Sequence, residues 1–332
     1  MRRVVLALVM VFVLLIGIGV MGVMMVRRPA TAEPVDSPDL TIDVPPGHQY
    51  GGPSFGRQLD ISPDGNRIVY VGSRHKGNRQ LFVHTIGETE PAEIPGAEVG
   101  NRDIRDPTFS PDGRYVAYWA QGIIKKTTLD GTTVSVIGNA PSTRGIGWLD
   151  SETLVLGNPE GDLLKLSAGK TSALVKSTGS ILPHVSPNIL PGNKAVLFTL
   201  ADGPLINARI QVLILETGEE RQLFDENAYA PRYLTSGHLV FGRGPTRELM
   251  AVRFDLSKLE IVGSAQPVLS VPLSGTGTGG STDYAVSQTG VVAYTPYHEA
   301  SINDTLAWFG GIPLTKIHVR LKWFEELNRS LP

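Results

Sequence analysis

The hydrophobic and polar positions of this chain alternate in short runs that return at regular intervals. Two of the strongest runs, Arg67–Val71 and Tyr115–Trp119, each follow the same turn, Ser-Pro-Asp-Gly, at residues 62–65 and 110–113. In such a turn proline presets φ, Asp caps the backbone two residues on, and Gly supplies a positive φ. Apolar residues do not recur every three or four positions here, so the pattern predicts β-hairpins and not helices.

Four degenerate copies of the turn precede further apolar runs, which are Thr153–Leu156, Ala195–Phe198, His238–Phe241 and Val291–Tyr294. Aligned on the third turn position, the six copies fall at intervals of 39 to 53 residues, at Asp64, Asp112, Ser151, Gly192, Ser236 and Thr289. A period of about 40–45 residues with short strands is the signature of propeller blades. The sequence therefore predicts an all-β fold, a six-bladed β-propeller with four-stranded antiparallel blades.

The blades are expected near residues 51–100, 101–141, 142–180, 181–229, 230–273 and 274–309. In the first blade the four expected strands are Arg57–Ile61, Arg67–Val71, Gln80–Thr85 and Ala92–Ile94. The sixth repeat supplies only three strands of its own, Asp283–Val286, Val291–Tyr294 and Thr305–Phe309.

A closed ring needs a fourth strand in the sixth blade, because open sheet edges invite aggregation. Two alternating segments are candidates, Leu40–Val44 and Lys316–Leu321. We expect residues 40–44 to close a propeller of residues 39–309, and residues 310–332 to add a C-terminal strand and a short surface helix at Trp323–Leu327. Deleting residues 38–46 should then cost a large part of the ~5–15 kcal/mol typical of a domain, and deleting residues 312–332 should be mild.

An uninterrupted apolar run, Val4–Val26, precedes the repeats. As a helix it reaches roughly the ~30 Å of a bilayer core, so we expect a transmembrane signal-anchor between a cytoplasmic stub (1–3) and a linker (27–38). The alternative is a signal peptide cleaved after Ala32; the length of the run and the arginines that follow it favour the anchor. The large polar remainder favours an orientation with the propeller outside the cytoplasm.

Composition excludes several classes. The formal charge is −2, with no basic stripe, so the chain is not expected to bind nucleic acid. Cysteine is absent, which removes disulfides and thiolate metal sites.

The order of the repeat phrases resembles one family. The phrases are Ser62–Val71, Gln80–Val83, Phe109–Tyr118, Leu190–Thr199, Arg232–Val240 and Thr305–Trp308. They are similar to the WD40-like (TolB-like) β-propeller joined to membrane-anchored bacterial serine/threonine protein kinases. The resemblance implies a bacterial inner-membrane protein, single-pass, with its propeller on the periplasmic or extracellular side. Two departures stand out: only Met1–Arg3 precede the membrane run, which leaves no place for a kinase, and the later repeats of the family are missing before residues 317–329.

Candidate chemistry has ordinary structural interpretations. Gly275–Gly280 matches Gly-x-Gly-x-x-Gly but leads into a strand, so we expect a loop between blades and no dinucleotide site. Asp64 and Asp112 are expected to cap turns, and the charge-dense stretch Asn101–Asp106 is a candidate for the axial mouth. The aromatic residues expected to pack within blades are Tyr118, Trp119, Trp148 and Phe198.

The histidines are scattered, and the favoured interpretation is a role in hairpins or on the surface, with a place at the central channel for one or two as the alternative. They are His48, His75, His84, His184, His238, His298 and His318. No hydrolase or zinc-protease motif occurs. We therefore assign no catalytic, cofactor-binding or metal-binding residues and expect no cofactor.

The predicted function is a non-catalytic, membrane-anchored sensor or scaffold that binds a protein or peptide at an axial face. Without a kinase it needs a membrane signalling partner. The alternatives are an enzyme of the propeller lyase or lactonase type, which requires convergent acid and base residues at the channel, and a truncated remnant without function.

Overall fold

The computed structural model describes residues 39–44, 48–51, 56–74, 78–98, 103–174, 182–201, 207–244, 246–269, 272–274, 282–297 and 316–331. Over these residues the chain forms β-strands and one α-helix, α3 (Trp323–Ser330). The chain divides into Met1–Asp36 and Ser37–Pro332, and every described residue belongs to the second unit. No helix within the described ranges is long and apolar enough to cross a membrane. The predicted membrane run, Val4–Val26, lies outside those ranges, as does Gly275–Gly280.

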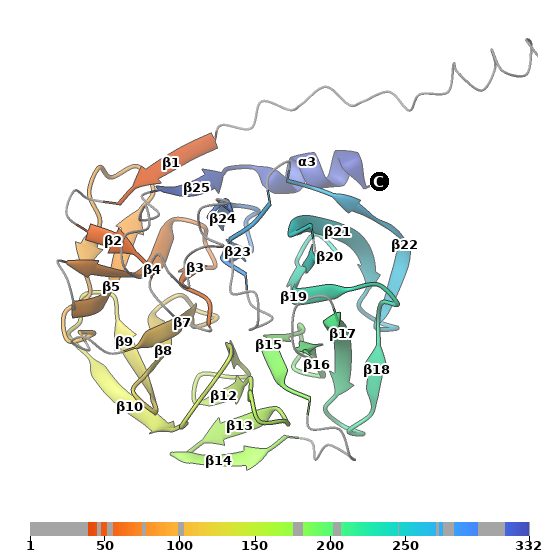
Figure 1. The fold of residues 1–332 in the computed structure, drawn as a ribbon, viewed down its shortest axis with the longest axis horizontal. Helices are drawn as coiled ribbons and strands as arrows, with labels where there is room; N and C mark the ends of the chain where they lie inside the picture. The colour runs from red at the N-terminus through yellow and green to blue at the C-terminus, as the bar shows by residue number, and fades with distance from the viewer. Residues whose placement is uncertain are drawn as a thin grey trace, which may run out of the picture. The chain divides into compact units, whose positions relative to one another are not determined.

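Six antiparallel sheets follow one another along the chain and stand around a common axis (Figure 1). The first blade consists of β2 (His48–Tyr50), β3 (Leu59–Ile61), β4 (Arg67–Arg74), β5 (Asn78–Thr85) and β6 (Ala92–Glu93). Two short strands, β2 and β3, together take the place of one innermost strand, because both pair with β4. The second blade consists of β7 (Ile104–Phe109), β8 (Tyr115–Ala120), β9 (Ile123–Thr128) and β10 (Val134–Asn139).

The next three blades repeat this order from the axis outward. The third holds β11 (Ile146–Trp148), β12 (Thr153–Leu156), β13 (Leu164–Ser167) and β14 (Lys170–Ala173). The fourth holds β15 (His184–Ile189), β16 (Ala195–Leu200), β17 (Arg209–Ile214) and β18 (Glu220–Gln222). The fifth holds β19 (Ala228–Leu234), β20 (His238–Arg243), β21 (Glu248–Asp255) and β22 (Glu260–Pro267). The predicted six-bladed, all-β propeller is confirmed.

The sixth blade combines strands from distant parts of the chain. Its order is β23 (Tyr284–Val286), β24 (Val292–Tyr294), β25 (Lys316–Arg320) and, at the outer edge, β1 (Asp39–Asp43). Leu40–Val44 was expected at the outer edge of this blade, and β1 lies there. The expectation for the third strand was wrong: β25 occupies that position, and Thr305–Phe309 lies outside the described residues.

The physical reason is the apolar face of β25. Ile317 and Val319 are fully buried, in a cluster with Ile42 of β1 and with Leu59 and Ile68 of the first blade. This face joins the last blade to the first, so residues 316–320 are part of the ring and not an addition to it.

Helix α3 was expected to be a short surface helix added to the ring. It does expose a polar face, at Glu325, Asn328 and Arg329, but its other face is buried against the blades. Trp323 and Leu327 are buried and pack in a cluster with Tyr284 and Val292 of the sixth blade and Val240 of the fifth. Because their spacing of four residues places both side chains on one face, this short helix fills the space between the two blades.

The turns that organise the repeat are formed as predicted. Asp112 Oδ1 accepts hydrogen bonds from Ser110 Oγ (2.6 Å) and from the backbone N of Arg114 (3.1 Å), and Asp64 accepts the equivalent pair from Ser62 and Asn66. These bonds hold the pKa of each carboxyl below its usual range, with the hydroxyl bond as the largest cause. The two aspartates therefore cap turns, as expected.

Candidate functional site: an axial funnel

Three inner strands share a feature that determines what faces the axis. In β7, β15 and β19 the pairing slips by one residue, and the first residue of each bulge has a positive φ: Asp106 (55°), Ser186 (54°) and Ala230 (52°). Proline follows each of them, at a position where a bulge removes the need for a ladder N–H.

Each bulge also links its blade to a neighbour. Asp106 N donates to Arg57 O (2.9 Å), Ser186 N to Arg144 O (2.7 Å) and Ala230 N to Thr199 Oγ1 (2.8 Å). The residues after the prolines are thereby directed to the axis; they are Thr108, Asn188 and Arg232.

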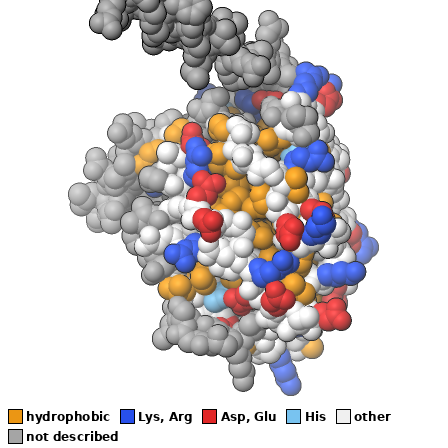
Figure 2. All heavy atoms as spheres, turned by 90° about the vertical axis from the view of Figure 1, so that its right-hand side faces the viewer, with side chains coloured by type: hydrophobic (Ala, Val, Ile, Leu, Met, Phe, Trp, Pro, Cys, Tyr) orange, Lys and Arg blue, Asp and Glu red, His pale blue; other side chains and the backbone are white. Residues whose placement is uncertain are grey.

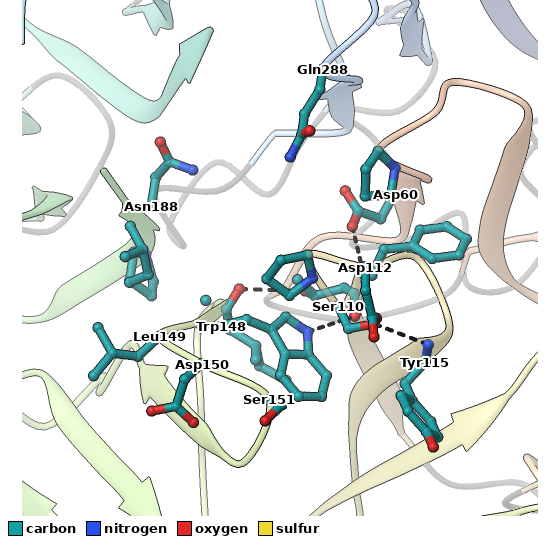
Figure 3. A pocket seen from close by; sticks show the side chains of 18 of the residues that line it. Asp60, Ser110, Asp112, Tyr115, Trp148, Leu149, Asp150, Ser151, Asn188 and Gln288 are labelled. Atoms are coloured by element: carbon teal, nitrogen blue, oxygen red, sulfur yellow. Dashed lines mark hydrogen bonds between the residues drawn. The ribbon is translucent and has the colours of Figure 1, made fainter. Parts of the chain in front are cut away.

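All six blades contribute to a funnel of about 880 Å³ at the end of the axis where the Ser-Pro-Asp-Gly turns lie. The inner strands line the deep part of the funnel, and the turns form its rim. Figure 3 shows Asp112, Asp150 and Ser151 around the rim, and the side-chain amides of Asn188 and Gln288 facing the open centre. In the charge-dense stretch Asn101–Asp106, none of the described residues, 103–106, lines this funnel.

Most charged side chains in the funnel are paired. Arg57 lies 3.5 Å from Asp60 Oδ1 and donates to Thr108 Oγ1 (3.0 Å). At the rim Arg114 pairs with Asp112 (2.7 Å), and Lys126 pairs with Glu152 (3.1 Å). Asp60 also accepts a hydrogen bond from the backbone N of Phe109 in the next blade (2.8 Å), so it joins two inner strands.

Arg232 differs from these cations. Its Nη1 donates to the carbonyl of the adjacent Pro231 (3.0 Å), and it forms no ion pair with any residue in the described ranges. Some of its surface stays open to the funnel although protein surrounds it. Burial, and then repulsion from Arg57, lowers the pKa of Arg232 to about 10.

Behind the funnel, Asp106 is a buried bridge. Its Oδ1 accepts from Arg57 N (2.9 Å) in the first blade, and its Oδ2 accepts from Gly145 N (3.0 Å) beside the third. It is 1% exposed, and burial raises its pKa. In the same charge-dense stretch, Arg105 pairs with Asp103 (2.6 Å) and lies over the Trp119 ring (3.9 Å). The described part of this stretch, residues 103–106, thus holds blades together.

Asp283 makes a similar link between the last blade and the first. Its Oδ1 accepts from Gln58 N (2.9 Å), and burial raises its pKa to about 6. A folded-state pKa above the ordinary value means that the folded chain binds this proton more tightly than the unfolded chain.

We therefore expect Asp283 to make the free energy of unfolding rise as pH falls from about 7 through 6 towards 4, by up to about 3 kcal/mol. Asp283→Asn keeps the oxygen acceptor and does not titrate, so it should remove this component. Urea unfolding of both proteins at several pH values between 4 and 7 measures the difference; parallel pH profiles would contradict the assignment.

The described histidines are remote from the funnel. His84, His184 and His238 are buried, His318 stacks on Tyr294, and none of the four lines the funnel. The side chains of His48, His75 and His298 lie outside the described residues. Among described residues no group of three or more His, Cys, Asp or Glu is placed to hold a metal ion.

The four aromatic candidates are buried in the blades, as expected. Trp148 has a second contact that the sequence did not indicate: it lines the funnel while its Nε1 donates to Thr108 O (3.1 Å).

The outer surface carries mixed charge. On the face shown in Figure 2, basic and acidic side chains are interspersed.

The sheets, the bulged inner strands and the funnel define a six-bladed β-propeller of TolB-like fold. Among solved structures, a protein described as TolB from Agrobacterium tumefaciens has a TM-score of 0.55 and 17% identity, over 73% of this chain and 90% of that one. A chain of the mitotic checkpoint complex has a TM-score of 0.56 and 10% identity, over 85% of this chain and 94% of that one.

TolB from Acinetobacter baumannii has a TM-score of 0.51 and 13% identity; the match covers 83% of this chain and 64% of that protein. At these identities the likeness concerns the fold alone. No protein-family model and no curated protein matches the chain.

Proposed function

We propose that this chain is a non-catalytic binding module whose axial funnel takes up an extended segment of a protein partner. The observation that carries the proposal is a funnel of about 880 Å³ to which all six blades contribute. Ligand sites typically have volumes of about 300–1,000 Å³ and few polar groups in defined positions. Asn188, Gln288 and Arg232 are such groups here.

The use of the carboxylates supports a non-catalytic role. Asp60, Asp106, Asp112 and Asp150 each accept a backbone N–H, so they act as caps and links between blades. General acid–base chemistry needs a group with a pKa near the working pH that also reaches the substrate. Asp283 has a raised pKa, but it does not line the funnel.

We further propose that residues 4–26 anchor the propeller outside the cytoplasm and that it derives from a receptor-kinase ectodomain. The apolar run and the order of the repeat phrases support this proposal. A membrane signalling partner would then act together with the propeller. A reporter fused after Pro332 should be active outside the cytoplasm, with the chain retained in membranes; a reporter active in the cytoplasm would overturn the orientation.

Blocking the funnel tests the binding function. Ser151 is exposed at the rim, in the turn between β11 and β12, and forms no hydrogen bond in the described ranges. Ser151→Trp should fold normally and fill the mouth. We expect the full chain to select peptides from a random hexapeptide library, and Ser151→Trp to lose that selection.

The matched control is Ser264→Trp, which makes the same change at an exposed position on β22. It should select the same peptides as the unaltered chain. Selection that is equal in all three proteins would place binding outside the funnel, and selection by none of them would contradict the proposed function.

A further inference from the structure

The guanidinium of Arg232 has unused hydrogen-bonding capacity. It carries five N–H donors, and in the described ranges only Nη1 has a partner, the carbonyl of Pro231. Arg57, Arg114 and Lys126, the other cations in the funnel wall, each pair with a carboxylate. Arg232 is therefore the only cation among the described lining residues that forms no ion pair.

The carboxylates near Arg232 already have other hydrogen-bonding or ion-pair partners. Asp60 pairs with Arg57 and accepts the N–H of Phe109, and Asp106 accepts two backbone N–H groups. Neither lies within ion-pair distance of Arg232. A largely buried charge without an ion pair destabilises the protein that carries it. Burial is the largest cause of the lowered pKa of Arg232, repulsion from Arg57 adds to it, and weaker attraction to Asp60 and Asp106 opposes both.

Two neutral donors lie in the same funnel. Asn188 Oδ1 accepts from the backbone N of Tyr233 (2.8 Å), which fixes the amide and leaves Nδ2 as the free donor. The side chain of Gln288 has no hydrogen bond to a described residue, and both amides face the open centre (Figure 3). Arg232, Asn188 and Gln288 come from the fifth, fourth and sixth blades, so three neighbouring blades present donors to one space.

We propose that Arg232, with Asn188 and Gln288, binds a carboxylate carried by the peptide segment that enters the funnel. This inference rests on the proposed binding function and specifies its ligand. A carboxylate matches the paired donors of a guanidinium, and hydrogen bonds between charged partners are about twice as strong as neutral ones.

The rim favours a peptide over a polyanion. Asp112 and Glu152 at the rim pair with Arg114 and Lys126, and Asp150 forms no ion pair with a described residue, so the described rim carries a small excess of negative charge. Phosphate groups carrying two charges, or a chain of them, would pass the unpaired carboxylate of Asp150 at a greater cost than a group with one charge. A single carboxylate at the end or on the side of an otherwise neutral or basic peptide passes it more readily.

The test uses the full chain and the peptides selected from the hexapeptide library. The affinity of the strongest binder is measured by calorimetry, with its carboxylates intact and with each converted in turn to an amide. The variants are Arg232→Gln, Arg232→Lys and the control Arg253→Gln, which changes an exposed arginine on β21 of the same blade.

We expect one amide conversion to weaken binding at least about tenfold in the unaltered chain and in Arg253→Gln, and to have little further effect in Arg232→Gln. Arg232→Lys should recover part of the affinity, because it keeps the charge without the planar fork. Arg232→Gln should unfold at the same or a higher temperature than the unaltered chain, since it removes a largely buried charge that forms no ion pair with a described residue.

The outcomes separate the two proposals. If selected peptides bind in the funnel but no amide conversion is coupled to Arg232, the carboxylate inference is wrong and the binding function stands. If no peptide is selected, both are wrong. Inorganic phosphate that binds through Arg232 in the absence of any peptide binding would overturn the choice of a peptide ligand.

Discussion

Removing residues 316–332 should prevent the propeller from folding. The deletion takes away β25, to which both β1 and β24 are paired, and with it the buried side chains of Trp323 and Leu327. β1 would lose its only described partner, β24 would lose one of its two, and the contact between the last blade and the first would open. Because domains are stable by only ~5–15 kcal/mol, we expect loss of the folded state, seen by circular dichroism and by rapid proteolysis.

Single substitutions distinguish a specific role of β25 from a general effect of truncation. Ile317→Ala removes a fully buried side chain and should lower the free energy of unfolding by about 2–5 kcal/mol. Lys316→Ala, at the adjacent position, should change it by about 0.5 kcal/mol or less, because its ion pair with Asp43 is exposed. Equal and small effects of the two substitutions in urea unfolding would mean that β25 does not close the ring.

Replacing Asp106 by alanine should be the most damaging single change near the funnel. It leaves the backbone N–H groups of Arg57 and Gly145 without acceptors in a buried position. Each unsatisfied group costs about 1–3 kcal/mol, so we expect a loss of about 2–6 kcal/mol in urea unfolding.

Two controls isolate this effect. Asp106→Gly relieves the positive φ of 55° and lacks the carboxylate, so a loss as large as that of the alanine variant would assign the effect to the hydrogen bonds. Asp112→Ala removes an exposed turn cap and should cost about 1 kcal/mol. An Asp106→Ala protein no less stable than Asp112→Ala would contradict the bridge.

The repeat was predictable because it depends on residues close together in the sequence. The Ser-Pro-Asp-Gly turns fix each hairpin within a few residues, and their period sets the number of blades without knowledge of any long-range contact. The third strand of the last blade was not predictable in this way. Its identity depends on the fit of Ile317 and Val319 against Leu59 and Ile68, which are about 250 residues away in the chain.

The funnel was only partly visible in the sequence. A signal was present in the tripeptides at 106–108, 186–188 and 230–232, each with proline in the middle of an inner strand. Proline there marks a bulge, and the residue after it faces the axis. The isolation of Arg232 could not be inferred, because it follows from how the surrounding carboxylates pair once the ring is closed.

The register of β1 with β25 sets an order of events during synthesis. Asp39 pairs with Arg320 and Asp43 with Lys316, and β1 has no other strand partner in the described structure. While the five blades between them are synthesised, residues 39–43 lack their partner strand β25. The ring can close only after residues 316–320 are available, so its closure is a contact between the earliest and latest strands of the propeller. Until then the chain exposes open sheet edges, and a chaperone that shields them would act on this protein before β1 pairs with β25.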